Sequence, residues 1–425
     1  MFRRFNFSLL AAAPLLCLMQ IAAAHGQTQP LVRTIEVPLD HRDRGLGAAR
    51  LSFELGAPFD KSKPVVLVIA DGQQFYVRRG AARELQQKLF GDAFNVVGII
   101  PRGGTPEFVK AALDPSGRPD WARAWRIFNA DQWVADIEAV RRSLVGDEGG
   151  VMLYGRSGGA YLIHQYLSRH GTRVARAFTQ SPVNPLLNRE LGIAIDRFWE
   201  ELGAQDRGLQ GLLRKALARD PGERLRMLVT LQRQHFFIPA ERIAPARAEL
   251  IRALAEGDAA LYERARKEYQ ADEVLKLYES AESIPQVVRV LELIHPSGAF
   301  RRLGGEAVYP LLESQHHFQK PLLALLEAGT IPAPSFDLSA AHRLDTEVFI
   351  LAGRRDEAVD YRTSIALAYS YPRHQLFIAD DNHVFSKLNE AGLVNRLLQG
   401  FLGSGPGSTE YQQALAAAAP YRWSE

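Results

Sequence analysis

The sequence is nearly free of cysteine, since Cys17 is the only one among 425 residues. One thiol cannot form an internal disulfide, and it cannot supply the cysteine clusters that hold structural zinc. Cys17 also lies in an N-terminal segment that we expect to be removed, so the mature chain would have no thiol nucleophile. His316 and His317 have no carboxylate or third histidine at ligand spacing, and we interpret them as pocket-lining or surface residues. The sequence therefore indicates no metal and no organic cofactor.

The chain also lacks an excess of charge of either sign. Lys and Arg number 51 and Asp and Glu number 48, which gives a formal net charge of +3. This balance predicts neither nucleic acid nor an anionic surface as a partner. Internal repeats and long low-complexity segments are absent too. The length suits one large domain, or a core with an inserted lid. The sequence gives no indication of the oligomeric state.

One long apolar run stands at the N-terminus. Arg3 and Arg4 precede the nearly continuous apolar stretch of residues 7–21, and three alanines follow at 22–24. A positive start, an apolar centre and small residues at the end are typical of a secretory signal peptide. We therefore expect a signal peptide over residues 1–24 and an exported bacterial protein, periplasmic or secreted, without a membrane span in its mature chain. The alternative is that the segment stays as an anchor, but its proline and its alanines favour removal.

The most informative segment is VMLYGRSGG, residues 151–159. An apolar run that resembles a strand ends in Gly-x-Ser-x-Gly, and a run that resembles a helix follows from Ala160. This is the context in which a serine on a sharp turn becomes a nucleophile. Gly155 and Gly159 suit the turn because a Cβ beside the serine would clash and because glycine tolerates unusual dihedral angles. The pattern predicts that Ser157 is a nucleophile.

Strand patterns and helix patterns alternate along the first half of the chain. Residues 34–39 and 50–55 suggest an opening antiparallel pair, and the apolar runs 64–70 and 94–100 are typical of strands buried on both faces. An amphipathic helix over 131–144 leads to the strand that begins at Val151. Strands resume at 346–352 and 374–379. We therefore expect an α/β protein with the α/β-hydrolase fold, a mostly parallel sheet with helices on both faces.

The region from about residue 185 to residue 338 has few strand signals and several helix signals, so we expect a helical lid inserted between the later strands. Pro245 is expected to open the helix over 246–255, where a proline costs no hydrogen bond. The expected organisation is a signal peptide at 1–24, a first core segment at 31–184, the lid (cap) at 185–340, a second core segment at 341–404 and a C-terminal tail at 405–425.

A serine nucleophile needs a base, and the base needs a group that orients it. In this fold the chain order is Ser, then Asp or Glu, then His. Asp356 stands just past one expected strand and His383 just past the last, where loops at the carboxyl ends of parallel strands face a ligand. We therefore predict that His383 is the general base and then the acid, with Asp356 orienting it. Three other carboxylates remain alternatives to Asp356: Asp360, Asp380 and Asp381.

The tetrahedral intermediate of acyl transfer needs two backbone N–H donors. We expect one from Gly158, directly after the serine, and the other from Gln73 in the loop that follows the 64–70 strand. Gly72 would let that backbone approach the substrate closely. Arg156 and Gln74 neighbour the expected serine and this loop, and we expect them to contact the substrate.

With these residues in place, the chain resembles the proline iminopeptidase and tripeptidyl aminopeptidase-like branch of the α/β-hydrolases. The segment VPLDH at 37–41 is similar to the opening "VPLD" of that branch, and FNVVGIIPRG at 94–103 is similar to its "FDVVGxDPRG". Residues 136–141 resemble the helix before the elbow, and Asp356 and His383 fit its acid and base. The likeness covers residues 37–180 and 346–402. The lid matches only as a helical insertion.

The departures from that branch fall around the expected site. DGQQF at 71–75 replaces His-Gly-Gly-Pro-Gly, Ile100 replaces an aspartate, Gly104-Thr105 replaces the usual following pair, and the elbow lacks the common aromatic residue after the serine. The resemblance also implies that lid carboxylates hold the free amine of a substrate. The candidates for that role are Glu292, Glu200 and Glu201.

These observations support an exported serine hydrolase that acts through an acyl-enzyme, with an aminopeptidase-like activity on short peptides. A carboxylesterase acting on small esters is the alternative, because both reactions use the same triad. A third hypothesis is a catalytically silent hydrolase fold that serves as a binding protein. The expected partner is a small-molecule or short-peptide substrate.

Overall fold

The structure is a computed structural model that describes residues 31–71, 76–200, 202 and 206–424. The expected signal peptide therefore lies outside the described residues, as do Gly72, Gln73, Gln74 and Glu201.

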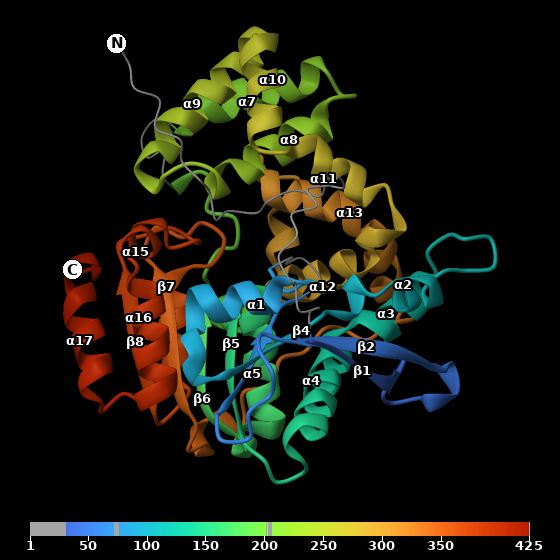
Figure 1. Cartoon of the computed structure of the whole chain (residues 1–425). Helices are drawn as coiled ribbons and strands as arrows, with labels where there is room; N and C mark the ends of the chain where they lie inside the picture. Colours follow the sequence, from blue (N-terminus) through green and yellow to red (C-terminus); the bar gives the residue numbers. More distant parts are fainter. Residues whose placement is uncertain (1–30, 72–75, 201, 203–205, 425) are drawn as a thin grey trace, which may run out of the picture.

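The strands of the described residues form one eight-stranded, mostly parallel sheet (Figure 1). Its strand order is β1-β2-β4-β3-β5-β6-β7-β8. β2 pairs antiparallel with both β1 and β4, and every other neighbouring pair is parallel. The predicted antiparallel opening and parallel remainder are thus confirmed. The strands are β1 Leu31–Pro38, β2 Ala48–Leu55, β3 Val65–Ile69, β4 Asn95–Ile99, β5 Val151–Arg156, β6 Val174–Gln180, β7 Glu347–Gly353 and β8 His374–Ala379.

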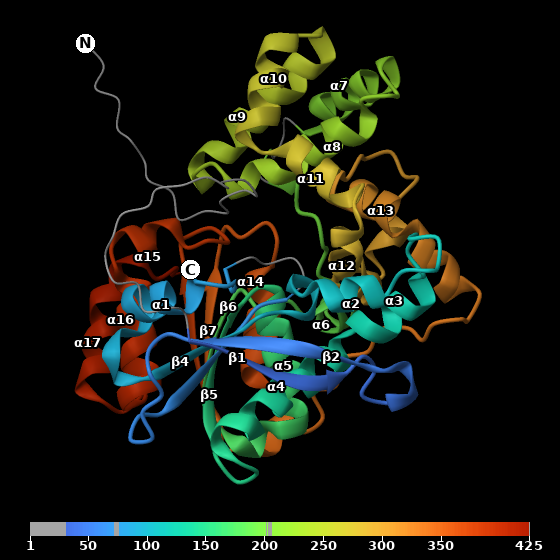
Figure 2. The ribbon, with the colours of Figure 1, turned by 45° about the vertical axis from the view of Figure 1, so that its right-hand side comes forward.

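The central strands are buried on both faces, as their continuous apolar runs predicted. Every residue of β3 and β4 is buried. Successive side chains alternate between the faces, so Val66 and Val68 of β3 pack in one apolar cluster and Leu67 and Ile69 in another. Helices α4, α5 and α14 cover the Leu67 face, and α1, α16 and α17 cover the Val66 face (Figure 2). Their bounds are α1 Ala81–Leu85, α4 Ala130–Val145, α5 Gly158–His170, α14 Tyr361–Tyr369, α16 Leu393–Gln399 and α17 Thr409–Ala418.

Helix α4 has the capping residue and the apolar spacing from which the sequence predicted it. Asn129 caps its start by accepting a hydrogen bond from the N–H of Asp131, which satisfies one of the free donors of the first turn. Trp133, Val134 and Ile137 recur at helical spacing and are all buried against the sheet. The predicted helix, 131–144, is confirmed with one residue added at each end.

The chain between β6 and β7 forms helices that lie above the carboxyl ends of the strands (Figure 1). Helices α7, α8 and α9 share an apolar cluster of their own, whereas α12 packs into the cluster that covers the Leu67 face of the sheet. This region, the cap, is thus both a separate helical layer and anchored to the core. Its helices are α6 Pro185–Glu190, α7 Asp206–Arg219, α8 Arg224–Arg233, α9 Ala240–Glu256, α10 Ala259–Glu268, α11 Ala271–Tyr278, α12 Ile284–Ile294 and α13 Pro310–Glu327.

The expectation that Pro245 opens a cap helix is wrong. Helix α9 begins five residues earlier, at Ala240, and Pro245 lies inside it. A proline there removes the bond to the carbonyl of Glu241. Burial explains the extension, because Ile243 in the added turn is 2% exposed and continues the apolar face of the helix.

The C-terminal tail completes one face of the core. Tyr411 and Ala414 of α17 are buried in the Val66-face cluster. Beyond the helix, the N–H of Trp423 donates a 2.8 Å hydrogen bond to the carbonyl of Ile378 in β8. The tail therefore packs along the last strand of the sheet.

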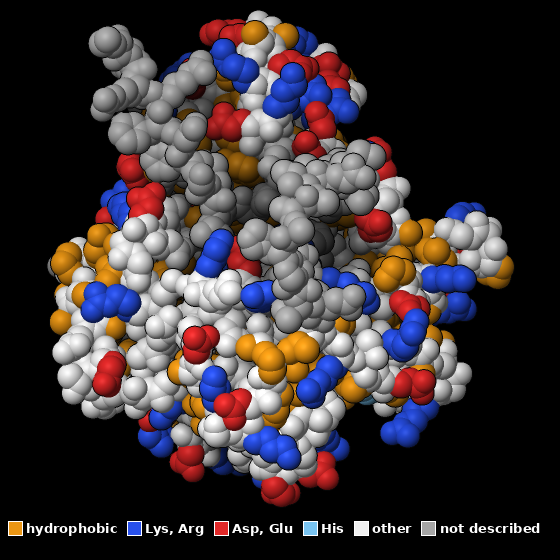
Figure 3. Space-filling model, viewed as in Figure 1, with side chains coloured by type: hydrophobic (Ala, Val, Ile, Leu, Met, Phe, Trp, Pro, Cys, Tyr) orange, Lys and Arg blue, Asp and Glu red, His pale blue; other side chains and the backbone are white. Residues whose placement is uncertain are grey.

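The arrangement is the α/β-hydrolase fold. A mostly parallel sheet is covered on both faces, and a sharp turn joins its strand β5 directly to α5. Lys and Arg side chains are interspersed with Asp and Glu on the face seen in Figure 3, as the balanced composition suggests. Within the described ranges, no helix combines the length and the apolar character that crossing a membrane requires.

Candidate active site

Ser157 stands on the sharp turn between β5 and α5. Its backbone has φ 50° and ψ −119°, a conformation that costs a residue other than glycine about 1–3 kcal/mol and persists only where its surroundings hold it. Two backbone hydrogen bonds hold Ser157 in this conformation. Its N–H donates to the carbonyl of Gln180 at 2.8 Å, and its carbonyl accepts from the N–H of Tyr161 at 3.0 Å. Ser157 is therefore fixed at the junction between the buried strand β5 and the start of α5.

Gly155 is needed for the same turn. A Cβ at that position would lie 3.0 Å from the carbonyl carbon of Gly159, in the first turn of α5, and 2.8 Å from Cδ1 of Ile163. Only glycine lets the first turn of α5 approach the strand this closely, which is the reason the sequence pattern has glycine there.

Asp356 and His383 meet above neighbouring strands. The Nδ1 atom of His383 lies 2.8 Å from Oδ2 of Asp356, and the Ser181 hydroxyl donates to the same oxygen at 2.7 Å. Oδ1 accepts hydrogen bonds from the N–H groups of Ala358 and Val359, at 2.8 Å and 2.9 Å. Both oxygens of this completely buried carboxylate are therefore bound, and its orientation toward the imidazole is fixed.

These contacts lower the pKa of the Asp356 carboxyl group and so favour its ionised form. Burial is the largest influence and would raise its pKa, but the charge of His383 and the hydrogen bonds from His383, Ser181 and Val359 outweigh it, so the pKa is lowered. The carboxylate is thus held ionised next to an imidazole, which is the state that orients a general base.

The three alternative carboxylates have other partners. Asp360 caps α14 and pairs with Arg362, Asp380 pairs with Arg355, and Asp381 accepts from backbone N–H groups. Among these four carboxylates, Asp356 is the one that contacts His383 in the described structure.

The strand register brings the predicted residues to one edge of the sheet. Arg156 pairs with Gln180, Gln180 pairs with Leu351, and Gly353 pairs with Ala379. The ends of β5, β6, β7 and β8 therefore lie side by side. Ser157, Asp356 and His383 all follow these ends, which is the position in open α/β sheets where ligands bind.

The cap contacts the candidate base. The ring of Phe236, in the 3₁₀ helix η7 (Gln234–Phe236), packs edge-on against His383 with ring centres 5.8 Å apart. Arg247 of α9 is buried and its Nη2 lies 2.7 Å from Glu357, directly after Asp356. The side chain of His383 is 13% exposed as a result of this cover. Ser181, Phe236 and this ion pair belong to no local motif, so the sequence did not predict them.

The oxyanion region is described in part. Gly158, which we expect to be the first donor, opens α5 directly after the serine. Gly72, Gln73 and Gln74 lie outside the described residues. Asp71, at the start of that loop, is described and completely buried. A Cβ at position 158 would lie 2.5 Å from the carboxyl carbon of Asp71. The carboxylate therefore fills the space in which a side chain at position 158 would stand.

Two of the residues expected to contact substrate have protein partners. Glu292 of α12 is buried, and its oxygens accept from the N–H of Ala130 at 2.9 Å and 3.1 Å and from Arg289. It therefore joins the cap to the start of α4. Burial raises its pKa to about 7, although Arg289 and the Ala130 N–H act in the opposite direction. The guanidinium of Arg156 lies 4.2 Å from the centre of the Tyr76 ring.

The remaining candidates also have protein partners. Glu200 pairs with Arg197 at 2.6 Å, and Nη1 of Arg197 donates a 3.4 Å hydrogen bond to the carbonyl of Asp356. His316 and His317 make ring contacts with Phe300 and Phe318. In the part of the chain that the structure describes, no group of three His, Cys, Asp or Glu side chains could hold a metal ion.

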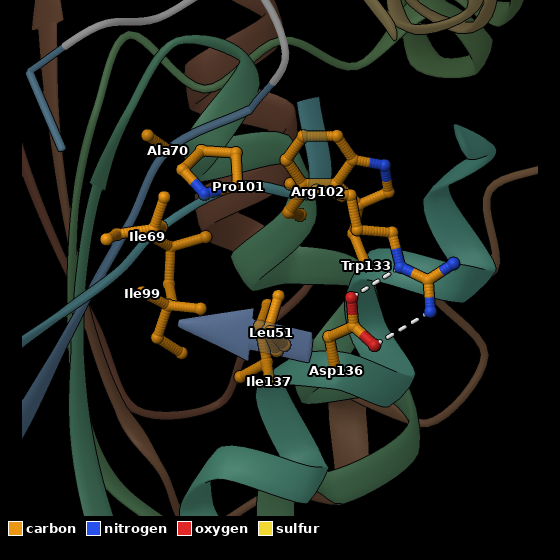
Figure 4. Close-up of a pocket in the computed structure, with 11 residues that line it drawn as sticks. Leu51, Ile69, Ala70, Ile99, Pro101, Arg102, Trp133, Asp136 and Ile137 are labelled. Atoms are coloured by element: carbon orange, nitrogen blue, oxygen red, sulfur yellow. Dashed lines mark hydrogen bonds and ion pairs between the residues drawn. The ribbon is translucent and has the colours of Figure 1, made fainter. Parts of the chain in front are cut away.

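Two hollows in the described structure are excluded as the acyl pocket. A cavity of about 10 Å³ lies below the end of β3, lined by apolar side chains and by the buried Arg102–Asp136 ion pair, and holds one water at most (Figure 4). A wider hollow of about 440 Å³ lies at the amino ends of β6 and β7. That is the sheet edge opposite Ser157, so the wider hollow is not the acyl pocket, and the cavity of about 10 Å³ is too small to hold an acyl group.

Comparisons with solved structures give distant similarities. No protein-family model matches the chain, and no curated protein matches it. An esterase from Rhodococcus is 16% identical, with 88% of this chain and 100% of that chain covered and a TM-score of 0.44. An acetylester hydrolase from Corynebacterium glutamicum is 12% identical, with 88% and 95% covered and a TM-score of 0.44. A bromoperoxidase from Bacillus anthracis is 14% identical, with 86% and 98% covered and a TM-score of 0.41. Identities and TM-scores this low do not indicate which activity this chain has.

Proposed function

We propose that the protein is a serine hydrolase that transfers acyl groups to water through an acyl-enzyme on Ser157. The observation that carries this proposal is the 2.8 Å contact between Asp356 and His383, made at the same sheet edge as a serine held on a strained turn. A histidine oriented by a buried carboxylate is the base that a serine hydroxyl needs.

The reaction follows from these positions. The imidazole of His383 takes the proton of the Ser157 hydroxyl while Oγ bonds to the carbonyl carbon, and the carbonyl electrons move to its oxygen. The Gly158 N–H, at the start of α5, donates to that oxygen. His383 then gives its proton to the leaving nitrogen or oxygen, and the bond to it breaks. Water attacks the acyl-enzyme in the same way and regenerates Ser157.

The substrate class we propose first is short peptides cleaved from the amino end. The resemblance to the proline iminopeptidase and tripeptidyl aminopeptidase-like branch supports this choice. One observation favours the alternative, a carboxylesterase on small esters: the carboxylate of Glu292, expected to hold a substrate amine, is already bound to Ala130 and Arg289.

A substrate panel separates the two activities. Aminoacyl arylamides with a free amine are tested beside short acyl esters, with Ser157→Ala as the inactive reference and Ser116→Ala, in the turn after α2, as a matched control. A peptidase cleaves the arylamides, and Ser157→Ala abolishes that cleavage. Activity on esters alone would replace the peptidase by the esterase, and activity that survives Ser157→Ala would contradict both.

Export is proposed on the sequence alone, because residues 1–24 lie outside the described structure. The mass of the protein recovered from the periplasm or medium of a bacterial host tests it. A mature chain that begins near His25 is expected, and a full-length chain in the membrane fraction would favour the anchor.

A further inference from the structure

The terminal segment, residues 421–423, is hydrogen-bonded to β8 just before the loop that carries the candidate base. The N–H of Trp423 donates to the carbonyl of Ile378 at 2.8 Å. The N–H of Asp380 donates to the carbonyl of Tyr421, also at 2.8 Å. β8 is the last strand of the sheet, and an edge strand presents unpaired backbone groups. The terminal segment therefore covers this edge where β8 ends and the loop of the base begins.

The same segment contacts the loop that carries the candidate acid. The guanidinium of Arg354 lies 5.3 Å from the centre of the Trp423 ring and 4.7 Å from the centre of the Tyr361 ring. The two rings themselves meet edge-on, with their centres 5.2 Å apart. A guanidinium within about 6 Å of an aromatic ring centre is attracted by the negative ring face. Because Arg354 stands two residues before Asp356, Trp423 is linked to the loop of the acid as well as to that of the base.

The two loops also lie directly against each other. The N–H of Arg354 donates to the carbonyl of Ala379 at 2.7 Å. A Cβ at Gly353 would lie 2.7 Å from the carbonyl oxygen of Asp381, so the loops approach as closely as a glycine allows. A shift of either loop would therefore change the position of the acid relative to the base.

We propose that Trp423 is a positioning residue for acyl transfer, because it holds the loops of Asp356 and His383 in their relative positions. The proposal rests on the proposed function, acyl transfer at Ser157. The indole acts through Arg354 and the main chain acts through β8, so Trp423 affects the rate of the chemical step and leaves substrate binding unchanged. A misplacement of about 1 Å caused far from the reacting atoms can slow an enzyme by about 100-fold.

The first test removes and then restores the aromatic ring. Trp423→Ala should lower kcat on the best ester or arylamide by about 10- to 100-fold and leave KM within about twofold. Trp423→Phe keeps an aromatic face for Arg354 and should recover most of that loss. Trp121→Ala is the matched control, because Trp121 is a half-buried tryptophan at the start of α3 (Trp121–Phe128) that packs against the Leu67-face cluster. It should preserve kcat.

The second test asks whether the ring acts through the guanidinium. Arg354→Met removes the charge and keeps an unbranched side chain. If the Trp423 ring acts on the acid loop through Arg354, the double variant Arg354→Met/Trp423→Ala should have the kcat of Arg354→Met alone, within about twofold. The rate at which a fluorophosphonate labels Ser157 should fall in the same order across these variants.

Four results would overturn the inference. Trp423→Ala could keep the kcat of the wild type, it could raise KM with kcat preserved, Trp423→Phe could lose as much as Trp423→Ala, or the two single losses could multiply in the double variant. If Trp423→Ala does not fold, Trp423→Leu is compared with Trp423→Phe in its place. A wild type that neither turns over substrate nor labels at Ser157 would contradict the proposed function. An active wild type with unaffected variants would contradict this inference alone, so the two failures are distinguishable.

Discussion

The Ser181 hydroxyl donates a 2.7 Å hydrogen bond to Oδ2 of Asp356, the same oxygen that lies 2.8 Å from Nδ1 of His383. Ser181 directly follows β6, the strand between those that carry Ser157 and Asp356. We therefore expect Ser181 to act as a positioning residue, because its hydrogen bond limits the rotation of the Asp356 carboxylate beside the imidazole.

Replacing Ser181 by alanine should lower kcat about 10-fold and leave KM unchanged, because a hydrogen bond to a charged group contributes about 1.5–3 kcal/mol and this one acts through Asp356. Steady-state kinetics on the best ester or arylamide measure the effect. Ser370→Ala is the control, because it removes a hydroxyl directly after α14 that donates to the carbonyl of Ala366 in that helix. A change in KM with kcat preserved would contradict the positioning role.

Asp356 should make stability sensitive to acid. Its pKa is lowered in the folded protein, so the unfolded state binds the proton more tightly. The stability it contributes is present above about pH 4 and is lost as the pH falls through the folded pKa. Urea unfolding between pH 6 and pH 2 should show a steeper loss for the wild type than for Asp356→Asn. Parallel curves would show that the carboxylate is not held as described.

Gly158 and Asp71 should behave as a steric pair. Gly158→Ala places a methyl group against the carboxyl carbon of Asp71, and overpacking of this kind costs about 1–3 kcal/mol. The double variant Asp71→Ala/Gly158→Ala should recover most of that loss of unfolding free energy, since the space is then vacated. Denaturant unfolding of both single variants and the double variant measures the coupling, and additive losses would refute it.

The ion pair between Arg247 and Glu357 should anchor the cap to the loop of Asp356. Both side chains are buried and lie 2.7 Å apart. Removing one partner leaves an unpaired buried charge, so Arg247→Ala should lower the unfolding free energy by about 3–5 kcal/mol. Arg247→Met combined with Glu357→Leu should cost less than either single change. If the double variant is the least stable of the set, this explanation of the cap contact is wrong.

Local patterns in the sequence predicted the parts of the fold that local forces determine. Each of these parts has its signal within a few neighbouring residues. The signals are the apolar runs of β3 and β4, the apolar spacing of α4 and the glycines of the turn at Ser157. Pro245 was misjudged because the burial of Ile243 extends α9 beyond the point where a proline usually stands. Tertiary packing overrode a local preference there.

The contacts of the candidate site depend on residues far apart in the chain. Ser181 and Asp356 are separated by 175 positions. The sequence around either residue does not predict the hydrogen bond between them. The loop beginning at Asp71 and the glycine at 158 stood out in the sequence as two separate departures from the branch that the chain resembles. The structure shows that they are one feature, because the carboxylate fills the space of the missing side chain. The role expected for Glu292 rested on resemblance, and its contacts with Ala130 and Arg289 reflect packing that the resemblance does not cover.

The proposed function requires that Ser157, activated by His383 and Asp356, forms a covalent bond with the acyl group. Mass spectrometry of the protein after treatment with a fluorophosphonate, followed by peptide mapping, tests it most directly. We expect one adduct on the peptide that contains Ser157, none in Ser157→Ala, and labelling slowed by at least about 100-fold in His383→Ala. Folded wild-type protein that carries no adduct, or an adduct on another residue, would rule out Ser157 as the nucleophile.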